Sequence, residues 1–344
     1  MANYTKANLV KAQALMTQRF NSGELRYRQP ATFLEFRRQA EIMIPSHKEL
    51  RTREDRAVEV NYFARSARSL GTGGRTHNHT GVKGDSETLT PTWTAYDDKF
   101  KYNLKQADIS VYDMESELAN EFGQVVANFA EGLEAVASNY LFNNRSGVNT
   151  YARQGAFNAT QDAFEITEST EGDRAVQITK SAMDFNKYQG IPYVFFCDTV
   201  AYDKFEKQAN QGSGNSDNLS FQFSNIRFVK SIDLDASAAG LATPYTKGFW
   251  IAVPEGMIAS LDWIPRQNRQ GVSVPPISEY GTLMNPVDTL MYATHKYMEA
   301  EDGSASNGYT QDVKTEVEIS IDLALEHAPL TTADETPLQA FALV

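Results

Sequence analysis

One segment of the chain has the repeat of a long amphipathic helix. Its apolar residues recur at spacings of three and four: Leu118, Phe122, Val125, Phe129, Leu133, Val136 and Tyr140. This spacing places them on one face of a helix. Glu115 and Glu117 favour the first turn, and Gly147 is a natural stop. The pattern predicts a helix over 113–143, about 45 Å long at 1.5 Å per residue, which suits a structural spine.

Other segments alternate apolar and polar residues, as strands with one buried face do. The clearest of these covers 313–325. Two more, Val58–Tyr62 and Phe100–Leu104, flank a stretch rich in glycine and polar residues. We predict that these two form a long two-stranded arm with a flexible tip. Because an isolated hairpin is marginal in water, we expect the arm to lie on another subunit.

The remaining segments predict a mixture of helices and strands. A capping box of Thr32 and Glu35 begins a short helix that ends before Pro45. Further helices are expected near 174–188 and 200–209, with a short helical turn after Pro254. Strands are expected at 191–197, 226–232, 249–253 and 290–300. Residues 1–30 have some helical tendency, 265–286 are expected to be irregular, and the C-terminal end is expected to be a loosely held tail. The fold class that follows is α+β.

Composition excludes several classes of protein. The 344 residues are 41% hydrophobic and 22% charged, which is ordinary for a globular protein and excludes wholesale disorder and fibrous repeats. A single cysteine excludes an internal disulfide framework and a cysteine-based zinc cluster. The uncharged run at 191–197 is too short to cross a bilayer. The N-terminal residues lack the pattern of a signal peptide.

The net charge of −12 is unevenly distributed along the chain. Residues 1–75 carry a balance of +7, so the rest of the chain carries −19. The acidic total argues against sequence-specific DNA binding. A basic arm on an acidic body is typical of contact with nucleic acid or of pairing with the acidic body of a neighbouring copy. We favour the second because it needs no ligand.

The residues with catalytic or metal-binding potential do not combine into a site. His77 and His79 lie in the glycine-rich stretch without a third ligand or a fixed geometry. The sequence Gly71-Thr-Gly-Gly lacks the Gly-Lys-Ser/Thr ending of a phosphate loop. Cys197 lies in an apolar strand, where cysteine acts as a small buried hydrophobe. Acidic pairs are more typical of solvated strand ends than of dyads: Asp97 with Asp98, and Asp233 with Asp235. We therefore predict no enzyme, no cofactor and no metal site.

The order of the elements resembles that of the major capsid proteins of tailed bacteriophages, the Hong Kong 97 fold. The resemblance runs from about Thr32 to about Leu330, chiefly through Thr92–Gln106 leading into Val111–Tyr140 and through the 313–325 strand. It implies an N-terminal arm with a short helix (1–55), an extended two-stranded loop (56–106), a peripheral domain with the spine helix (107–173), an axial domain (174–286), peripheral strands (287–330) and a C-terminal tail (331–344).

The same resemblance implies a function. Members of this family assemble as pentamers and hexamers into an icosahedral shell around double-stranded DNA. The expected partners are other copies of the chain, the portal, scaffold and decoration proteins, and non-specifically held DNA, with no membrane contact. The expected location is the virion, assembled in the host cytoplasm. The residues expected at contacts between subunits are Arg65, Arg68, Arg75, Lys83, Trp93 and Tyr96. We expect no cleaved propeptide and no cross-link from Lys83, for which no acceptor is identified.

Three alternatives remain open. An encapsulin-type nanocompartment would have the same fold but would enclose an enzyme and not a genome. A tail or baseplate component would form rings or tubes. A metal-dependent enzyme using His77 and His79 would lose its metal when both histidines were replaced.

Overall fold

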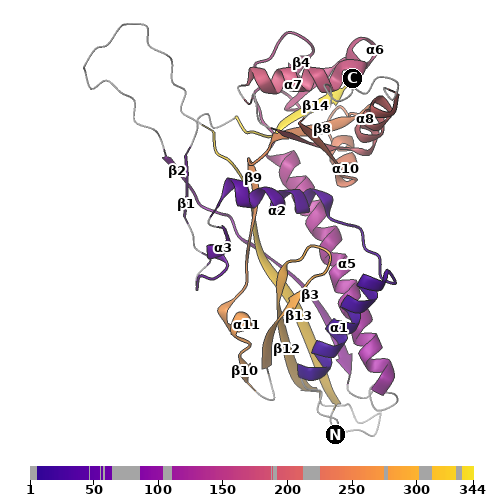
Figure 1. Ribbon diagram of the computed structural model, residues 1–344, viewed down its shortest axis with the longest axis vertical. Coiled ribbons are helices and arrows are strands. Elements are labelled where there is room, and N and C mark those ends of the chain that lie inside the picture. The colour runs from indigo at the N-terminus through magenta and orange to yellow at the C-terminus, as the bar shows by residue number, and fades with distance from the viewer. Residues whose placement is uncertain are drawn as a thin grey trace, which may run out of the picture.

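The chain is organised around one long helix, α5 (Val111–Asn143), against which two six-stranded sheets pack in the computed structural model (Figure 1). The helix confirms the prediction for 113–143, and the predicted apolar stripe is buried from Leu118 to Leu133. The structure describes residues 6–45, 47–54, 56, 59–63, 86–103, 111–186, 188, 192–211, 225–274, 278–301, 312–330 and 335–344.

The first sheet is antiparallel and is built along β13 (Asp312–His327). Its strand order is β10 (Ser273–Val274), β11 (Ser278–Met284), β12 (Met291–Glu301), β13 and β3 (Thr94–Asn103), and β9 (Ile258–Trp263) pairs with the last part of β13. Alternate side chains of β13, such as Val317 and Ile319, are buried in the same core as α5. Aromatic rings join the sheet to the helix: the Phe129 and Tyr292 centroids lie 4.6 Å apart.

The second sheet is mixed, in the order β4 (Ala156–Asn158), β5 (Ala163–Ile166), β14 (Gln339–Leu343), β8 (Phe249–Pro254), β6 (Tyr193–Cys197) and β7 (Ile226–Lys230). Both of its faces are covered. Phe196 and Ile251 belong to the core that contains α5, whereas Phe195 and Trp250 pack in a second core under α7 and α8. A sheet covered on both faces explains the continuous apolar run of β6.

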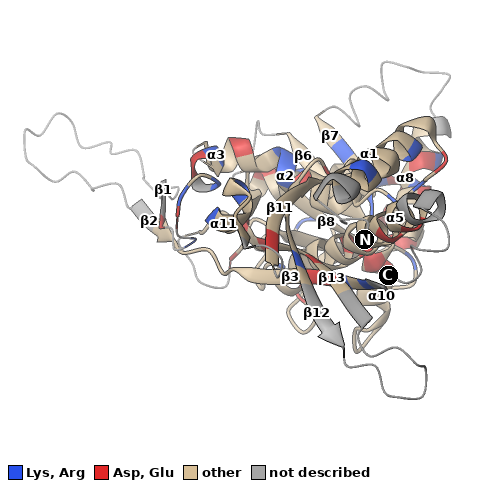
Figure 2. Cartoon of the chain, turned by 90° about the horizontal axis from the view of Figure 1, so that it is seen from below, with Lys and Arg blue, Asp and Glu red and all other residues tan. Residues whose placement is uncertain are grey.

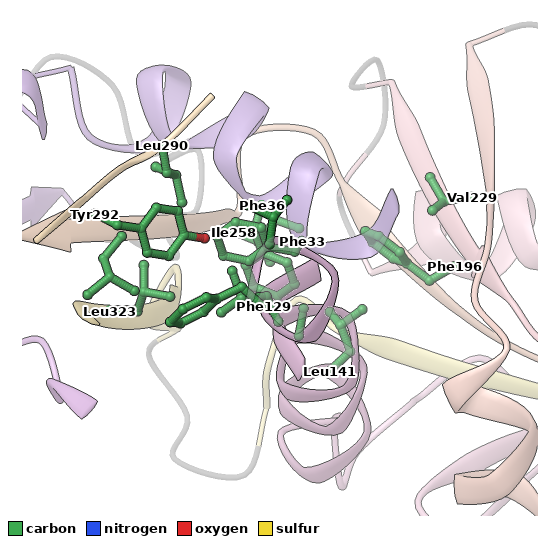
Figure 3. Packing of buried hydrophobic residues seen from close by; sticks show 14 of the residues in the cluster. Phe33, Phe36, Phe129, Leu141, Phe196, Val229, Ile258, Leu290, Tyr292 and Leu323 are labelled. Atoms are coloured by element: carbon green, nitrogen blue, oxygen red, sulfur yellow. The ribbon is translucent and has the colours of Figure 1, made fainter. Parts of the chain in front are cut away.

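The remaining helices cover the two sheets (Figure 1). They are α1 (Lys6–Ser22), α2 (Ala31–Met43), α3 (His47–Leu50), α6 (Glu168–Glu171), α7 (Ala175–Phe185), α8 (Thr199–Gln211), α10 (Asp233–Ala239) and α11 (Arg266–Gln270), with a 3₁₀ turn at Gly172–Arg174. Helix α2 lies across α5 near the junction of the two sheets. Figure 3 shows its Phe33 and Phe36 between the Tyr292 side of the core and the Phe196 side. One hydrophobic core therefore contains residues from α2, from α5 and from both sheets.

The pairing expected for the two-stranded arm is wrong. β1 (Val60–Phe63) pairs with β2 (Ser86–Leu89), and β3 pairs with β13. Val58 and Leu104, the outer ends of the two expected strands, lie outside the described residues. Phe100 is buried against Phe122 of α5, with ring centroids 5.2 Å apart. An alternating pattern identifies the buried face of a strand but not its partner, and burial of Phe100 determines which partner β3 takes.

The capping box predicted at the start of α2 is also wrong. The helix begins at Ala31, so Thr32 lies inside it. The Glu35 carboxylate accepts hydrogen bonds from Gln39 and Arg227 and does not reach back to the start of the helix. The acceptor for the free N–H groups of this helix comes from α5, as described below.

Several stretches expected to lack regular structure are ordered. Residues 265–286 contain α11, β10 and β11, and the expected tail contains β14, whose residues are buried between β5 and β8. The expected turn after Pro254 leads directly into β9. Asp233 and Asp235 begin α10 and are not at a strand end. Of the strands in the first two of these stretches, only β14 takes its partners from distant parts of the chain, whereas β10 and β11 pair with each other and β11 pairs with the next strand, β12.

Candidate assembly surfaces

The residues expected at subunit contacts divide into two groups. Arg65, Arg68, Arg75 and Lys83 lie outside the described residues, as do His77 and His79. Trp93 and Tyr96 are described, and both are partly buried. The Trp93 ring packs against a small cluster that includes Met43 and Ile44, and its buried indole nitrogen has no acceptor in the described part of the chain. Tyr96 lines a groove beside α5.

Strands β1 and β2 form a two-stranded sheet of their own, the β1–β2 ladder, separate from the two six-stranded sheets. Four residues of each strand pair, from Val60 opposite Leu89 to Phe63 opposite Ser86. Figures 1 and 2 both show the ladder on the side of the body away from α5. A two-stranded ladder of this length is not stable by itself in water. Its stability must come from the residues at its base, where Leu89 packs on the Ala40–Met43 cluster, or from another molecule.

A groove runs between α5 on one side and β3 and β13 on the other. It consists of two open cavities of about 350 Å³ and about 250 Å³, which share Tyr96, Leu133 and Val136 as lining residues. Its floor includes Leu323 and Leu325 of β13. Asp97 and Asp98 line the smaller cavity, and neither cavity is lined by a described lysine, arginine or histidine. The groove therefore has an apolar floor and an acidic end.

Much of the positive charge of the N-terminal region is paired within the chain. Arg28 lies 3.1 Å from Asp233, Arg56 lies 2.9 Å from Asp322, and Arg51 donates to Asp262 over 3.0 Å. A further pair joins Arg38 to Glu255. Figure 2 shows basic and acidic segments next to one another around α2 and α3. For these cations, the charge difference seen in the sequence reflects pairing with the acidic body of the same copy.

A buried carboxylate on α5 holds the start of α2. Glu134 is 1% exposed, and its oxygens accept hydrogen bonds from the Thr32 N–H (2.8 Å), the Thr32 hydroxyl (2.6 Å) and the Phe33 N–H (3.4 Å). A hydrogen bond with Ser231, after β7, connects the same carboxylate to the second sheet. Burial raises the pKa of the Glu134 carboxyl above its usual value, and these hydrogen bonds oppose the shift. The contacts of Glu134 with Thr32 and Ser231 therefore connect α5 to α2 and to the second sheet.

The described residues that were weighed as a nucleophile or as a carboxylate pair are either buried or engaged in contacts within the chain. Cys197 is fully buried, and burial raises its thiol pKa well above the usual value. Asp233 pairs with Arg28, whereas Asp235 accepts hydrogen bonds from the backbone and hydroxyl of Thr199. Neighbouring Asp198 accepts from the N–H groups of residues 201 and 249, and burial raises its pKa to about 6. Over the described ranges, no group of three or more His, Cys, Asp or Glu side chains is placed to hold a metal.

Among the helices that the structure describes, none combines the length and the apolar character that a membrane span requires.

Comparison with known proteins finds structural similarity but no sequence relative. No family model matches the chain, and no curated protein matches it. Among solved structures, the capsid asymmetric unit of cyanophage A-1(L) matches with 12% identity and a TM-score of 0.47, covering 92% of this chain and 93% of that one. The capsid asymmetric unit of cyanophage Pam1 matches with 10% identity and a TM-score of 0.43, covering 86% and 87%.

The capsid of Ralstonia phage GP4 matches with 9% identity and a TM-score of 0.42, covering 84% of this chain and 85% of that one. All three are structures of phage capsids.

Proposed function

We propose that this chain is the major capsid protein of a tailed double-stranded DNA bacteriophage, with a structural and not a catalytic role. In this function, copies assemble as pentamers and hexamers into a closed icosahedral shell. The observation that carries the proposal is the β1–β2 ladder, which stands away from a body built around one long helix. Such a ladder is marginal alone and would be stabilised by a neighbour in the shell, and closed symmetry repeats each neighbour contact many times, so that weak contacts are sufficient.

The division into parts follows sheet membership under this proposal. The peripheral part comprises α5 and the first sheet, and the axial part comprises the second sheet with α7, α8 and α10. Strands β9, β10 and β11 then belong with the peripheral strands, although the order of the elements in the sequence places 258–284 in the axial part. Strands β4, β5 and β14 belong with the axial part. The extended loop is the segment from β1 to β2.

The partners follow from the same function. They are other copies of the chain, a portal, scaffold and decoration proteins, and packaged DNA held without sequence specificity. The acidic net charge is consistent with DNA contact that uses local basic segments and not the whole inner surface. The protein would reside in the virion after assembly in the host cytoplasm.

The test is assembly of the full chain. The protein is produced alone and together with the product of its upstream neighbour gene, and it is examined by sedimentation and negative-stain electron microscopy. We expect closed icosahedral shells, or pentamers and hexamers. A monomer or dimer under both conditions would contradict the proposal, rings or tubes would indicate a tail component, and shells that enclose an enzyme would indicate a nanocompartment.

A deletion separates the extended loop from the fold. Removal of residues 70–84 is expected to leave a folded subunit that assembles poorly, because the described core contains none of these residues. Circular dichroism and thermal unfolding check the fold, and sedimentation checks assembly. Normal shells from the deleted chain would refute the role given to the loop.

A further inference from the structure

A short segment after α2 crosses the first sheet and leads to the β1–β2 ladder. It comprises residues 47–54 and Arg56, and we call it the strap. Arg51 donates to Asp262 of β9 over 3.0 Å, and Arg56 lies 2.9 Å from Asp322 of β13. Figures 1 and 2 both show α3, the first part of the strap, beside the ladder. Strand β1 begins four residues after Arg56, so the strap attaches the first strand of the ladder to the body.

The backbone of the strap is also held by polar contacts. The Arg53 carbonyl accepts hydrogen bonds from the Trp263 indole over 3.2 Å and from the Arg269 guanidinium over 2.6 Å. Glu54 pairs with Arg266 of α11. Partly exposed ion pairs each contribute little to stability. A modest change in charge at the strap is therefore sufficient to shift it between a docked and a released state.

His47, at the start of the strap, is a buried titratable residue. Its side chain belongs to a residue that is 6% exposed, and its Nδ1 atom is buried without a hydrogen-bond partner among the described residues. In a neutral imidazole, Nδ1 can be the nitrogen that carries no proton. In the imidazolium both nitrogens carry a proton, so the Nδ1 proton would be buried without an acceptor. The docked strap therefore suits the neutral ring.

The charges around His47 also favour the neutral ring. Those that face it are Glu41 on α2, Arg51 on the strap and Asp262 on β9. Both carboxylates already have partners, since Glu41 lies 2.5 Å from Lys48 and Asp262 accepts from Arg51. Burial, followed by the charge of Arg51, lowers the pKa of His47 below its usual value of 6.5, and the two carboxylates and a backbone carbonyl oppose this shift only in part.

We propose that His47 is a pH switch at the base of the β1–β2 ladder, and that protonation of its imidazole in mildly acidic solution releases the strap from β9 and β13. Release exposes the ring to water, where the imidazolium is well solvated. Because the pKa of His47 is lowered in the docked state, docking is fully stable above about pH 6.5 and weakens as the pH falls through the lowered pKa. The second strand of the ladder stays attached, since Leu89 packs on the Ala40–Met43 cluster.

Hydrogen exchange of the full chain measures release of the strap. The unassembled subunit is compared at about pH 7.5 and about pH 5.5, on either side of the usual histidine pKa. Exchange is read by mass spectrometry in peptides that cover 47–54 and is corrected for the intrinsic rate at each pH. We expect protection of 47–54 to fall at least about threefold at the lower pH, because each unit between the docked and released pKa values allows up to about tenfold. Peptides from α5 are expected to keep their protection.

Variants of His47 separate its protonation from other effects of pH. His47→Gln has a neutral polar side chain that does not protonate, and it is expected to protect 47–54 equally at both pH values. His47→Lys carries a positive charge at both and is expected to release the strap even at the higher pH. His295→Gln removes a histidine from β12 of the same sheet and serves as the matched control, which is expected to show the wild-type fall. Circular dichroism checks that each variant folds, and His47→Asn offers the same test where glutamine is not tolerated.

A titration of the His47 ring by NMR gives a second, direct measurement. A pKa below 6.5, together with a fall in protection that disappears in His47→Gln, would support the switch. Equal protection of the wild type at both pH values, an equal fall in His47→Gln, or a His47 pKa at or above its usual value would overturn it. The switch goes beyond the proposed function and none of these readouts uses assembly, so failure of either proposal leaves the other standing.

Discussion

The two sides of α5 differ in what covers them. The side that faces α1 and α2 is filled by the same chain: Tyr27 lies against Gly123, and the α2 N–H groups donate to Glu134. The side that faces the groove has an apolar floor with open space at Gly132. The difference shows that one amphipathic helix can be covered by its own chain on one side and border an open groove on the other.

The largest expected loss of stability comes from a substitution in the hydrophobic core to which both sides of α5 contribute. Leu133 is 1% exposed and lines the groove floor. Leu133→Asp buries a charge without a partner and is expected to lower the free energy of unfolding by about 4 kcal/mol or more, so that the chain does not fold. Circular dichroism and proteolysis measure the loss. Asn139→Asp, exposed on the same helix, is the control and is expected to change stability by no more than about 0.5 kcal/mol.

The next largest loss of stability is expected on the side of α5 that α2 covers. Glu134→Ala removes the acceptor for two N–H groups and one hydroxyl, all buried, and is expected to cost about 2–4 kcal/mol in urea unfolding. Glu134→Gln retains one acceptor oxygen and is expected to cost less. If Glu134→Ala loses less than about 1 kcal/mol, the carboxylate does not hold α2 in place.

The same carboxylate predicts a dependence on pH. Because burial raises the pKa of Glu134 in the folded state, the folded chain binds this proton more readily than the unfolded chain. The contribution of Glu134 to stability is therefore full below its unfolded pKa and falls as the pH rises through the folded pKa, by about 1.4 kcal/mol for each pH unit that separates the two pKa values. Urea unfolding between about pH 4 and 7 should show this fall. Glu134→Gln should flatten it, and an unchanged slope would contradict the raised pKa.

The smallest effects compare the two glycines directly. Gly132→Ala is expected to raise the free energy of unfolding by about 0.5–1 kcal/mol, because alanine favours the helix and meets nothing. Gly123→Ala gains the same propensity but must displace the Tyr27 ring, and a net loss is expected. Thermal unfolding of the two variants side by side measures the difference. A gain from both substitutions would remove the contrast between the two sides of α5.

Local sequence patterns were sufficient to predict the elements that have long, regular apolar repeats. Helix α5 and strand β13 have long, regular apolar repeats, and both lie within a few residues of their predicted bounds. The shorter elements β6, β8, α7 and α8 were also predicted within a few residues. Of the candidate contact residues, Tyr96 lines the groove and Trp93 packs against the cluster that includes Met43 and Ile44, and the subunit contacts expected of them stay predictions.

Partners that are far apart in sequence explain what local patterns missed. The acceptor for the start of α2 lies about a hundred residues away on α5, so the nearby Glu35 suggested the wrong cap. The strand β14 has no alternating pattern, because both of its faces are buried: Ala340 and Ala342 lie in the core that contains α5, and Phe341 and Leu343 lie in the second core. The groove was not predictable, since no motif marks the place where β3 and α5 leave a space.

The sequence by itself determined the α+β class, the long helix, the closing strand and the unequal distribution of charge, because each depends on residue type and on local periodicity. Only the tertiary structure decided which strand pairs with β3, where the cations of the arm find their carboxylates, and which face of α5 stays open. Those outcomes depend on contacts between residues that are distant in the chain. Buried polar groups form hydrogen bonds with whichever partners the fold brings close, and a strand takes the partner that buries its apolar face.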